Sequence, residues 1–170
     1  MRRAIEVLNR LERERCVEGY AIGGGVAVLF HAEPVLTYDL DVFVLLPSAE
    51  GSSLVDLSPL YRRLRQDGHV PDREYVLIEG TPVQFLVAYN ALVEEAVREA
   101  VEVPFEGATT RVVRLEHLLA IMAQTNRPKD RERLAVVLSE VEPDPKRLRD
   151  ILTRHGLLDR WDALTRSALP

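Results

Sequence analysis

Three consecutive glycines, Gly23-Gly24-Gly25, constrain the fold of this chain more than any other sequence feature. They follow a short apolar run, Tyr20-Ala21-Ile22, that is typical of a buried strand, and they precede residues 26–30, which are apolar enough for a buried helix. A second run, from Asp39 to Leu46, begins with Asp39-Leu40-Asp41 and is otherwise apolar, which is typical of a strand. Pro47 ends it. The sequence therefore predicts the order strand, glycine turn, helix, strand.

Apolar residues at helical or alternating spacing predict most of the other elements. The runs on either side of Gly80-Thr81 indicate two antiparallel strands joined by a two-residue turn, with the glycine in its first central position. Asn126 is expected to cap a helix that has Pro128 in its first turn, and Gly156 to end the last helical segment. The predicted helices cover residues 4–15, 26–30, 60–66, 88–100, 115–125, 126–141 and 145–155, and the predicted strands cover residues 20–22, 39–46, 75–79, 82–86 and 109–113.

Helices and strands in this order predict an α/β (α+β) protein, with a mixed sheet flanked by helices and a helical C-terminal portion. The chain has 170 residues, of which 46% are hydrophobic, so it can bury one core of ordinary size. We expect residues 1–142 to form one domain and residues 143–170 to form a helical extension packed on that domain.

The composition limits the setting and the partners. A single cysteine, Cys16, cannot form an internal disulfide, which favours a reducing, cytoplasmic environment. No apolar run reaches the roughly 20 residues of a membrane-spanning helix, so no membrane partner is expected. With 22 Lys and Arg against 27 Asp and Glu, the net charge of −5 gives no sign of a generally basic, nucleic-acid-binding surface.

The two aspartates of Asp39-Leu40-Asp41 are candidates for a metal site. Side chains alternate along a strand, so Asp39 and Asp41 project from the same face. Two like charges so close together repel each other unless a cation offsets them, and magnesium prefers oxygen ligands. The alternative is that both aspartates face water at the edge of a strand, as isolated surface charges commonly do.

The glycine run has two interpretations of equal weight. Residues without a Cβ let a phosphate approach the backbone, and the following helix offers free amide donors at its positive end. The glycines could equally form a tight turn that lets strand and helix pack closely. Two common nucleotide motifs are absent, because Val28 stands where the dinucleotide motif has its last glycine and the chain contains no Gly-Lys-Ser or Gly-Lys-Thr.

Taken together, these residues resemble the core of the minimal nucleotidyltransferases. The resemblance rests on residues 20–27, then Glu33-Pro34, Thr37 and residues 39–42, and it covers roughly residues 18–140. A later segment, from Leu118 to Arg127-Pro128-Lys129-Asp130, is similar to the helix and Arg-x-Lys-Asp turn of the AbiEii-type toxins of toxin–antitoxin systems. The resemblance implies that Gly23 and Gly24 hold the triphosphate, with Thr37, Arg127 and Lys129 contributing to nucleotide binding, and that Asp39 and Asp41 bind Mg²⁺.

Two positions depart from the family pattern. The third carboxylate of the family corresponds here to Gln84, which can orient a substrate through its carbonyl but cannot accept a proton as Asp or Glu does. Gln84 could also be an ordinary half-exposed strand amide, and Glu79 or Glu74 could supply a carboxylate instead. Where many relatives carry a lysine, this chain has Met122, which removes one phosphate contact.

The remaining polar residues give weaker indications of function. Without the resemblance, Arg127 and Lys129 would be interpreted as a solvated turn at a helix start, where cations oppose the helix dipole. The histidines are far apart in the sequence, lack metal-ligand spacing and are expected at helix ends or on the surface. They are His31, His69, His117 and His155.

The resemblance implies a Mg²⁺-dependent nucleotidyltransferase that moves a nucleotidyl group from a nucleoside triphosphate to a hydroxyl on RNA, protein or a small molecule, with Asp39, Asp41 and Gln84 at the reaction centre. The finer expectation is a toxin that acts on tRNA or a protein and has an antitoxin partner. Gln84 and Met122 motivate the alternative of a catalytically degenerate member that binds nucleotide or a protein partner. A third hypothesis is an interaction module that uses its acidic surface alone.

Overall fold

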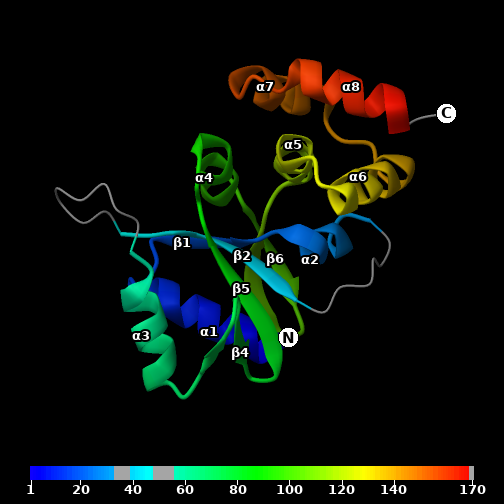
Figure 1. The fold of residues 1–170 in the computed structure, drawn as a ribbon. Helices are drawn as coiled ribbons and strands as arrows, with labels where there is room; N and C mark the ends of the chain where they lie inside the picture. Colours follow the sequence, from blue (N-terminus) through cyan, green and yellow to red (C-terminus); the bar gives the residue numbers. More distant parts are fainter. Residues whose placement is uncertain (33–38, 48–55, 169–170) are drawn as a thin grey trace.

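The computed structural model of the protein describes residues 1–32, 39–47 and 56–168, which form an α/β fold (Figure 1). The strands are β1 (Gly19–Ile22), β2 (Leu40–Leu45), β3 (Pro71–Asp72), β4 (Tyr75–Ile78), β5 (Thr81–Val87), β6 (Val101–Phe105) and β7 (Ala108–Val112). The helices are α1 (Arg2–Arg13), α2 (Gly24–Leu29), α3 (Ser58–Gln66), α4 (Ala91–Arg98), α5 (Leu115–Thr125), α6 (Pro128–Glu140), α7 (Pro145–Arg154) and α8 (Leu158–Ala168).

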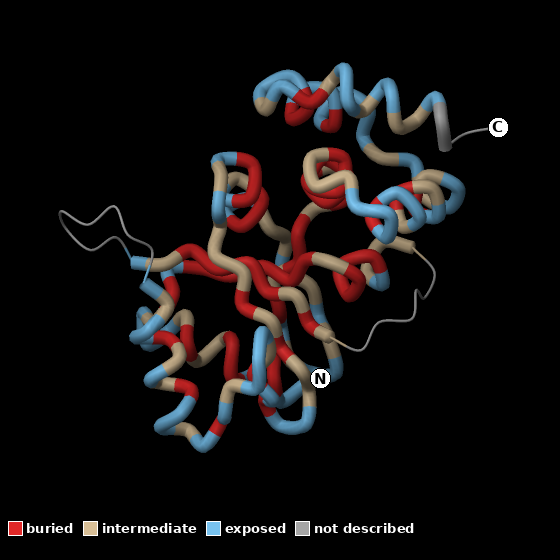
Figure 2. Tube along the Cα trace, viewed as in Figure 1, coloured by how far each residue is buried: buried red, intermediate tan, exposed pale blue. Residues whose placement is uncertain are grey.

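Within the described residues, the strands form one seven-stranded sheet in the order β3-β4-β5-β2-β1-β7-β6. The inner pairs β2–β5 and β1–β7 are parallel, whereas β1–β2 and the outer pairs are antiparallel. The sheet is therefore mixed, as the sequence predicts, and β2 lies near its centre with a neighbour on each side. Figure 2 shows the buried residues concentrated along these inner strands.

Helices cover both faces of the sheet (Figure 1). On one face α1 contacts β1, β4 and β7, and on the other α4 contacts β1 and β2. The apolar stripe of α1 is buried as its spacing predicts, and the hydroxyl of the buried Tyr20 donates a hydrogen bond to Asn9 Oδ1 at 2.6 Å, which ties α1 to β1. None of the described helices has the length and apolar character needed to cross a membrane.

The C-terminal segment is helical, and it holds one helix more than the sequence predicted. Asp144 caps α7, because its Oδ1 accepts hydrogen bonds from the backbone amides of Lys146 and Arg147. After α7 the chain turns at Gly156, which has a φ of +64°, and continues into α8. Both α7 and α8 contact α5, and α8 also contacts α6.

The turn between β4 and β5 differs from the predicted one. Ile78 pairs with Thr81, so the central turn residues are Glu79 and Gly80, with φ values of +49° and +83°. Two positive φ values in succession are typical of a type I′ turn, whose second central residue is preferentially glycine, so Gly80 takes the second position and not the first. The β6–β7 hairpin repeats this arrangement at Glu106-Gly107. Strand β6 was not predicted from the sequence, and its Pro104 is tolerated because β6 is an edge strand.

The β6–β7 turn predicts a stabilising substitution. Glu106 has a φ of +48°, a region that costs most L-residues about 1–2 kcal/mol but that asparagine adopts readily. We expect Glu106→Asn to raise the free energy of unfolding in urea by roughly 0.5–1 kcal/mol. Glu102→Asn in β6 is the matched control, and an equal or larger gain at 102 would contradict the explanation.

Candidate functional site

The site begins with the pairing of two neighbouring parallel strands. The register of β2 and β5 places Asp41 opposite Gln84, so the two side chains lie next to each other on one face of the sheet. Both are partly exposed, whereas the flanking Leu40, Val42 and Val83 are buried on the opposite face. Asp39 immediately precedes β2 and is also partly exposed. The structure therefore brings together the three residues that the sequence assigned to a reaction centre.

The glycine turn packs directly against β2. The backbone amide of Gly23 donates a hydrogen bond to the carbonyl oxygen of Asp41 at 2.9 Å. A Cβ on Gly23 would lie 2.3 Å from the ring of Phe43, and a Cβ on Gly24 would lie 1.8 Å from Asp41 Oδ2. Gly24 also has a φ of +55°. These contacts favour the close-packing interpretation of both glycines, and their role toward phosphate stays a prediction.

The α5–α6 turn approaches the same face, and one buried aspartate holds it. Asp130 is 3% exposed and accepts hydrogen bonds from Thr125 Oγ1 and from Arg127 Nε, both at 2.7 Å. Asn126 does not cap α6 as predicted, because with a φ of +52° it ends α5, and its side-chain oxygen accepts a hydrogen bond from Arg131. Arg127 is the N-terminal boundary residue of α6. The turn is therefore fixed by Thr125, Arg127 and Asp130.

A cavity of about 120 Å³ lies between the sheet and the α5–α6 turn. Its lining includes Arg133, which the sequence analysis did not assign to the site. It also includes five residues that the sequence analysis did assign to the site, namely Gly24, Asp41, Gln84, Arg127 and Lys129. Met122, which is 4% exposed, forms part of the wall. Gly23 lies against Phe43, and Thr37 falls outside the described residues. Arg133 could have been found from the sequence, because it follows Lys129 by four residues and so lies on the same helix face.

Charge in the cavity is divided between the sheet and α6. Burial raises the pKa of Asp41, and the nearby charge of Asp39 raises it further. The positive charges of Lys129, Arg133 and Arg127 act in the opposite direction on the pKa of Asp41. The sheet thus supplies close carboxylates, and α6 supplies the cations that partly offset them.

Tyr75 is a site residue that sequence reasoning missed. It stands one residue beyond the Val76–Val83 pair, which places it across from Gln84 on β5. Its hydroxyl donates a hydrogen bond to Asp39 Oδ2 at 3.4 Å, and the charge of Asp39 is the main reason that the pKa of Tyr75 is raised. The hairpin register was the signal that could have found it, because Tyr75, Gln84 and Asp41 form one row across three strands.

The two glutamates considered as substitutes for a third carboxylate lie elsewhere. Glu79 is in the β4–β5 turn, where its carboxylate accepts a hydrogen bond from Arg3 at 3.1 Å. Glu74 is exposed immediately before β4. Neither is among the described residues that line the cavity. Gln84 is therefore beside Asp41, and neither Glu74 nor Glu79 supplies a third carboxylate to the cavity wall.

The raised pKa of Asp41 predicts a pH-dependent stability. Because the pKa is above 3.8 in the folded chain, folding opposes ionisation, and stability is lost as the pH rises from 3.8 through the folded pKa. In metal-free buffer at pH 7 we expect Asp41→Asn to raise the melting temperature, because the amide removes the cost of a partly buried negative charge. The increase should be about 2–4 °C for each 1 kcal/mol gained in the free energy of unfolding. The gain should shrink toward pH 4. The exposed Asp162→Asn is the control, and a lower melting temperature for Asp41→Asn at pH 7 would contradict the prediction.

The Gly23 contact predicts a coupled pair of substitutions. Gly23→Ala should lower the free energy of unfolding by about 1–3 kcal/mol, because the new methyl group overlaps the Phe43 ring. Combining it with Phe43→Leu should recover part of that loss in a double-mutant cycle measured by urea unfolding. Gly19→Ala at the start of β1, where the nearest atom to an added Cβ is 3.4 Å away, should have a smaller effect. Strictly additive losses would show that Phe43 is not the cause.

The sequence matches no protein-family model and no curated protein. The fold is similar to that of an antigenic nucleotidyltransferase-like protein from Paracoccidioides brasiliensis, with a TM-score of 0.57 and 13% identity over 98% of this chain and 90% of that chain. Two structures of ANT(2″)-Ia have TM-scores of 0.46. One is a solution structure of this antibiotic-resistance factor, with 17% identity over 96% of this chain and 88% of that chain. The other is a crystal structure in complex with adenylyl-2″-tobramycin, with 16% identity over 97% and 94%. The described sheet and helices, together with the first of these likenesses, give the chain a nucleotidyltransferase-like fold.

Proposed function

We propose that this protein is a Mg²⁺-dependent nucleotidyltransferase that moves a nucleotidyl group from a nucleoside triphosphate to a hydroxyl acceptor. The observation that carries the proposal is the pairing of Asp41 with Gln84 on adjacent parallel strands, facing Lys129 across one cavity. Carboxylates opposite cations suit a metal-bound polyphosphate, which carries both positive and negative charge. The fold likeness is consistent with this chemistry, although at 13% identity it establishes the fold alone.

The donor atoms at the site fit a hard divalent cation. Asp39 and Asp41 offer carboxylate oxygens, which Mg²⁺ prefers. Burial and the charge of Asp39 disfavour the ionised form of Asp41 and so raise its pKa, and a bound cation would offset both effects. Asp39 and Asp41 would hold the ion, and Tyr75 would keep the Asp39 carboxylate in place through its hydrogen bond. When bound, Mg²⁺ neutralises phosphate charge and aligns the reacting oxygens.

The other residues bind and orient the substrates. Lys129 and Arg133 would contact phosphate oxygens as cations. The guanidinium of Arg127 already donates a hydrogen bond to the Asp130 carboxylate. The attacking hydroxyl oxygen forms a bond to the α-phosphorus while the bond to pyrophosphate breaks. The Gln84 carbonyl would accept a hydrogen bond from that hydroxyl and so orient it, and the proton that the hydroxyl loses would pass to solvent water, because an amide cannot hold it.

A second candidate function is nucleotide binding without transfer. Gln84 beside Asp41 removes the basic group from the position where a carboxylate would assist proton removal, and the buried Met122 brings no charge to the cavity wall. Such a protein would keep the metal and phosphate contacts and use the bound state to recognise a partner.

The finer proposal is that the chain is an AbiEii-type toxin that acts on tRNA or a protein and is controlled by an antitoxin. It rests on the sequence resemblance between residues 118 and 130. The described helix α5 and the turn to α6 have the helix-and-turn form of that segment. The cytoplasmic setting stays a prediction from the sequence.

A labelling experiment tests the transfer reaction. The purified chain is incubated with Mg²⁺, each of the four α-³²P-labelled nucleoside triphosphates, and bulk tRNA or protein as acceptor. We expect labelled acceptor from the wild-type protein and only background label from Asp39→Asn and Asp41→Asn, because each removes one anionic oxygen ligand. Gln84→Asp should increase the rate, because it restores a proton acceptor beside Asp41. Gln66→Asp on the exposed face of α3 is the matched control.

Titration calorimetry with Mg²⁺ and each triphosphate separates the two candidates. Binding together with transfer agrees with the enzyme, whereas binding without transfer in both the wild-type and the Gln84→Asp protein favours the second candidate. If neither binding nor labelling occurs, both are wrong and an interaction module becomes the better hypothesis. Full labelling by Asp41→Asn would contradict the proposed role of Asp41 as a metal ligand.

A further inference from the structure

His117 lies in the first turn of α5, a helix-end position of the kind that the sequence predicts for the histidines, but it is fully buried. Its side chain is 0% exposed, between α5 and α4. Most histidines buried in a core satisfy both ring nitrogens. In the part of the chain that the structure describes, His117 Nδ1 is one of two buried side-chain polar atoms without a hydrogen-bond partner.

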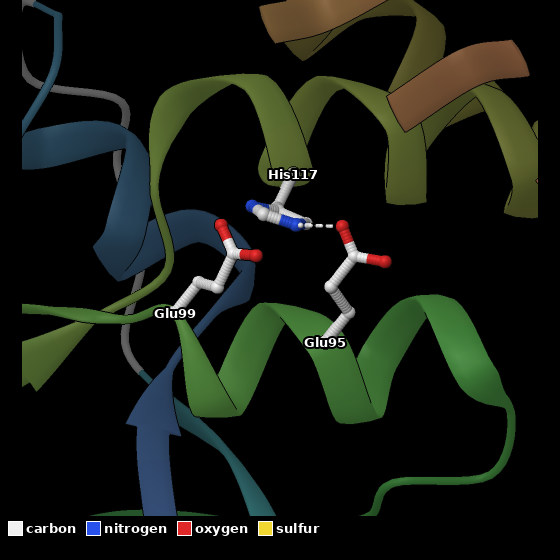
Figure 3. A group of neighbouring side chains, drawn as sticks. All are labelled: Glu95, Glu99 and His117. Carbon is white, nitrogen blue, oxygen red and sulfur yellow. Dashed lines mark hydrogen bonds and ion pairs between the residues drawn. The ribbon is translucent and has the colours of Figure 1, made fainter. Parts of the chain in front are cut away.

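The other ring nitrogen is held by Glu95. His117 Nε2 lies 3.0 Å from Glu95 Oε1 (Figure 3). A carboxylate at neutral pH can only accept hydrogen bonds, so Nε2 carries a proton and donates a hydrogen bond to Glu95 Oε1. With the proton on Nε2, the neutral form of the ring has its lone pair on Nδ1. This is the arrangement found where a histidine binds a metal through one nitrogen and is oriented by a carboxylate through the other.

The free nitrogen faces a second carboxylate. In Figure 3 the ring of His117 lies between Glu95 and Glu99, with its second nitrogen toward the Glu99 carboxylate. One ligand atom from each of the three residues lies within 4.8 Å of the others. A lone pair and a carboxylate facing each other are two acceptors without a donor, which is unfavourable unless a proton or a metal cation lies between them.

We propose that His117 Nδ1 and the Glu99 carboxylate bind a divalent transition-metal ion such as Zn²⁺, with Glu95 as the residue that orients the imidazole. Imidazole and carboxylate together suit Zn²⁺ and related ions better than Mg²⁺. Ligand bonds of about 2.0–2.2 Å require the Glu99 carboxylate to move closer to the ring. Glu99 is exposed at the end of α4, so its side chain has room for this movement.

A surface cavity of about 260 Å³ lies beside Glu99. Glu99 lines it together with two aspartates, three basic side chains and one isoleucine, namely Asp144, Asp150, Lys146, Arg147, Arg154 and Ile151. Water molecules in this cavity could complete the coordination, as they do in metal sites with few protein ligands. The site is separate from the aspartate site, because it lies between α4 and α5, and an ion bound there would join α4 to the helix whose residues Leu118 and Met122 line that other cavity.

Neighbouring cations oppose the proposed ion and provide a sharp test. Arg154 Nη2 donates to Glu95 Oε1 at 2.6 Å, and His155 Nε2 lies 2.8 Å from Glu95 Oε2. Arg114 donates to the backbone oxygen of Glu99 at 2.7 Å. The side chain of Arg154 is 52% exposed, so it can turn into solvent when an ion binds. Removing its charge should therefore strengthen metal binding.

Zinc titration by calorimetry tests the proposal on the full-length chain. The titration uses the Asp39→Asn/Asp41→Asn protein, so that the aspartate pair does not contribute. We expect one Zn²⁺ per chain, and a shift of the His117 Nδ1 resonance in ¹⁵N spectra while Nε2 stays protonated. Because replacing the buried His117 could disturb folding, the exposed Glu99 carries the mutational test. Glu99→Gln should weaken binding about tenfold or more.

Two further variants complete the experiment. Glu94→Gln, an exposed glutamate on the same helix, should bind Zn²⁺ as the parent protein does. Arg154→Met should bind it severalfold more tightly. The proposal is overturned if Zn²⁺ does not bind the parent protein, if Glu99→Gln and Glu94→Gln bind equally, or if Arg154→Met binds no more tightly. A shift at Nε2 in place of Nδ1 would also overturn it.

Discussion

The parallel pairing of β2 with β5 is the constraint on which the rest of the site depends. Strand β2 is an inner strand with Leu40, Val42 and Val44 buried on one face. A slip of one residue would carry Asp41 to the face where these three side chains are fully buried, so packing on that face fixes the register. That register is what places Asp41 beside Gln84. The site geometry is therefore set by apolar packing on the opposite side of the same strand.

The close approach of the glycine turn gives this strand a second restraint. Gly23 and Gly24 occupy space that a Cβ would deny to Phe43 and Asp41. Two glycines in this position thus serve the fold, whatever they also do for a ligand. The cations of α6 reach the same cavity because Asp130, buried in the turn, holds Thr125 and Arg127 together. Close packing and the Arg127–Asp130 ion pair thereby bring opposite charges to one cavity.

The sequence predicted most of the elements because their apolar spacing is strong. It missed the two-residue strand β3 and also β6, where Pro104 weakens the strand pattern. It also missed α8, which follows a glycine that was expected to end the last helix. It also placed Gly80 in the first turn position and assigned Asn126 to the start of α6. Both errors concern backbone conformations with positive φ, which Glu79 and Asn126 adopt although neither is glycine. Residue type alone did not reveal that choice.

Among the candidate site residues, the sequence by itself predicted the same-face placement of Asp39 and Asp41, because alternation along a strand is a local property. It also determined that Gln84 and Met122 lack charge. Only the tertiary structure decided that Gln84 lies beside Asp41, that Arg133 and Tyr75 join the site, and that His117 meets Glu95 and Glu99. Those contacts join segments far apart in the chain, and they depend on strand register and helix packing, which local spacing does not specify.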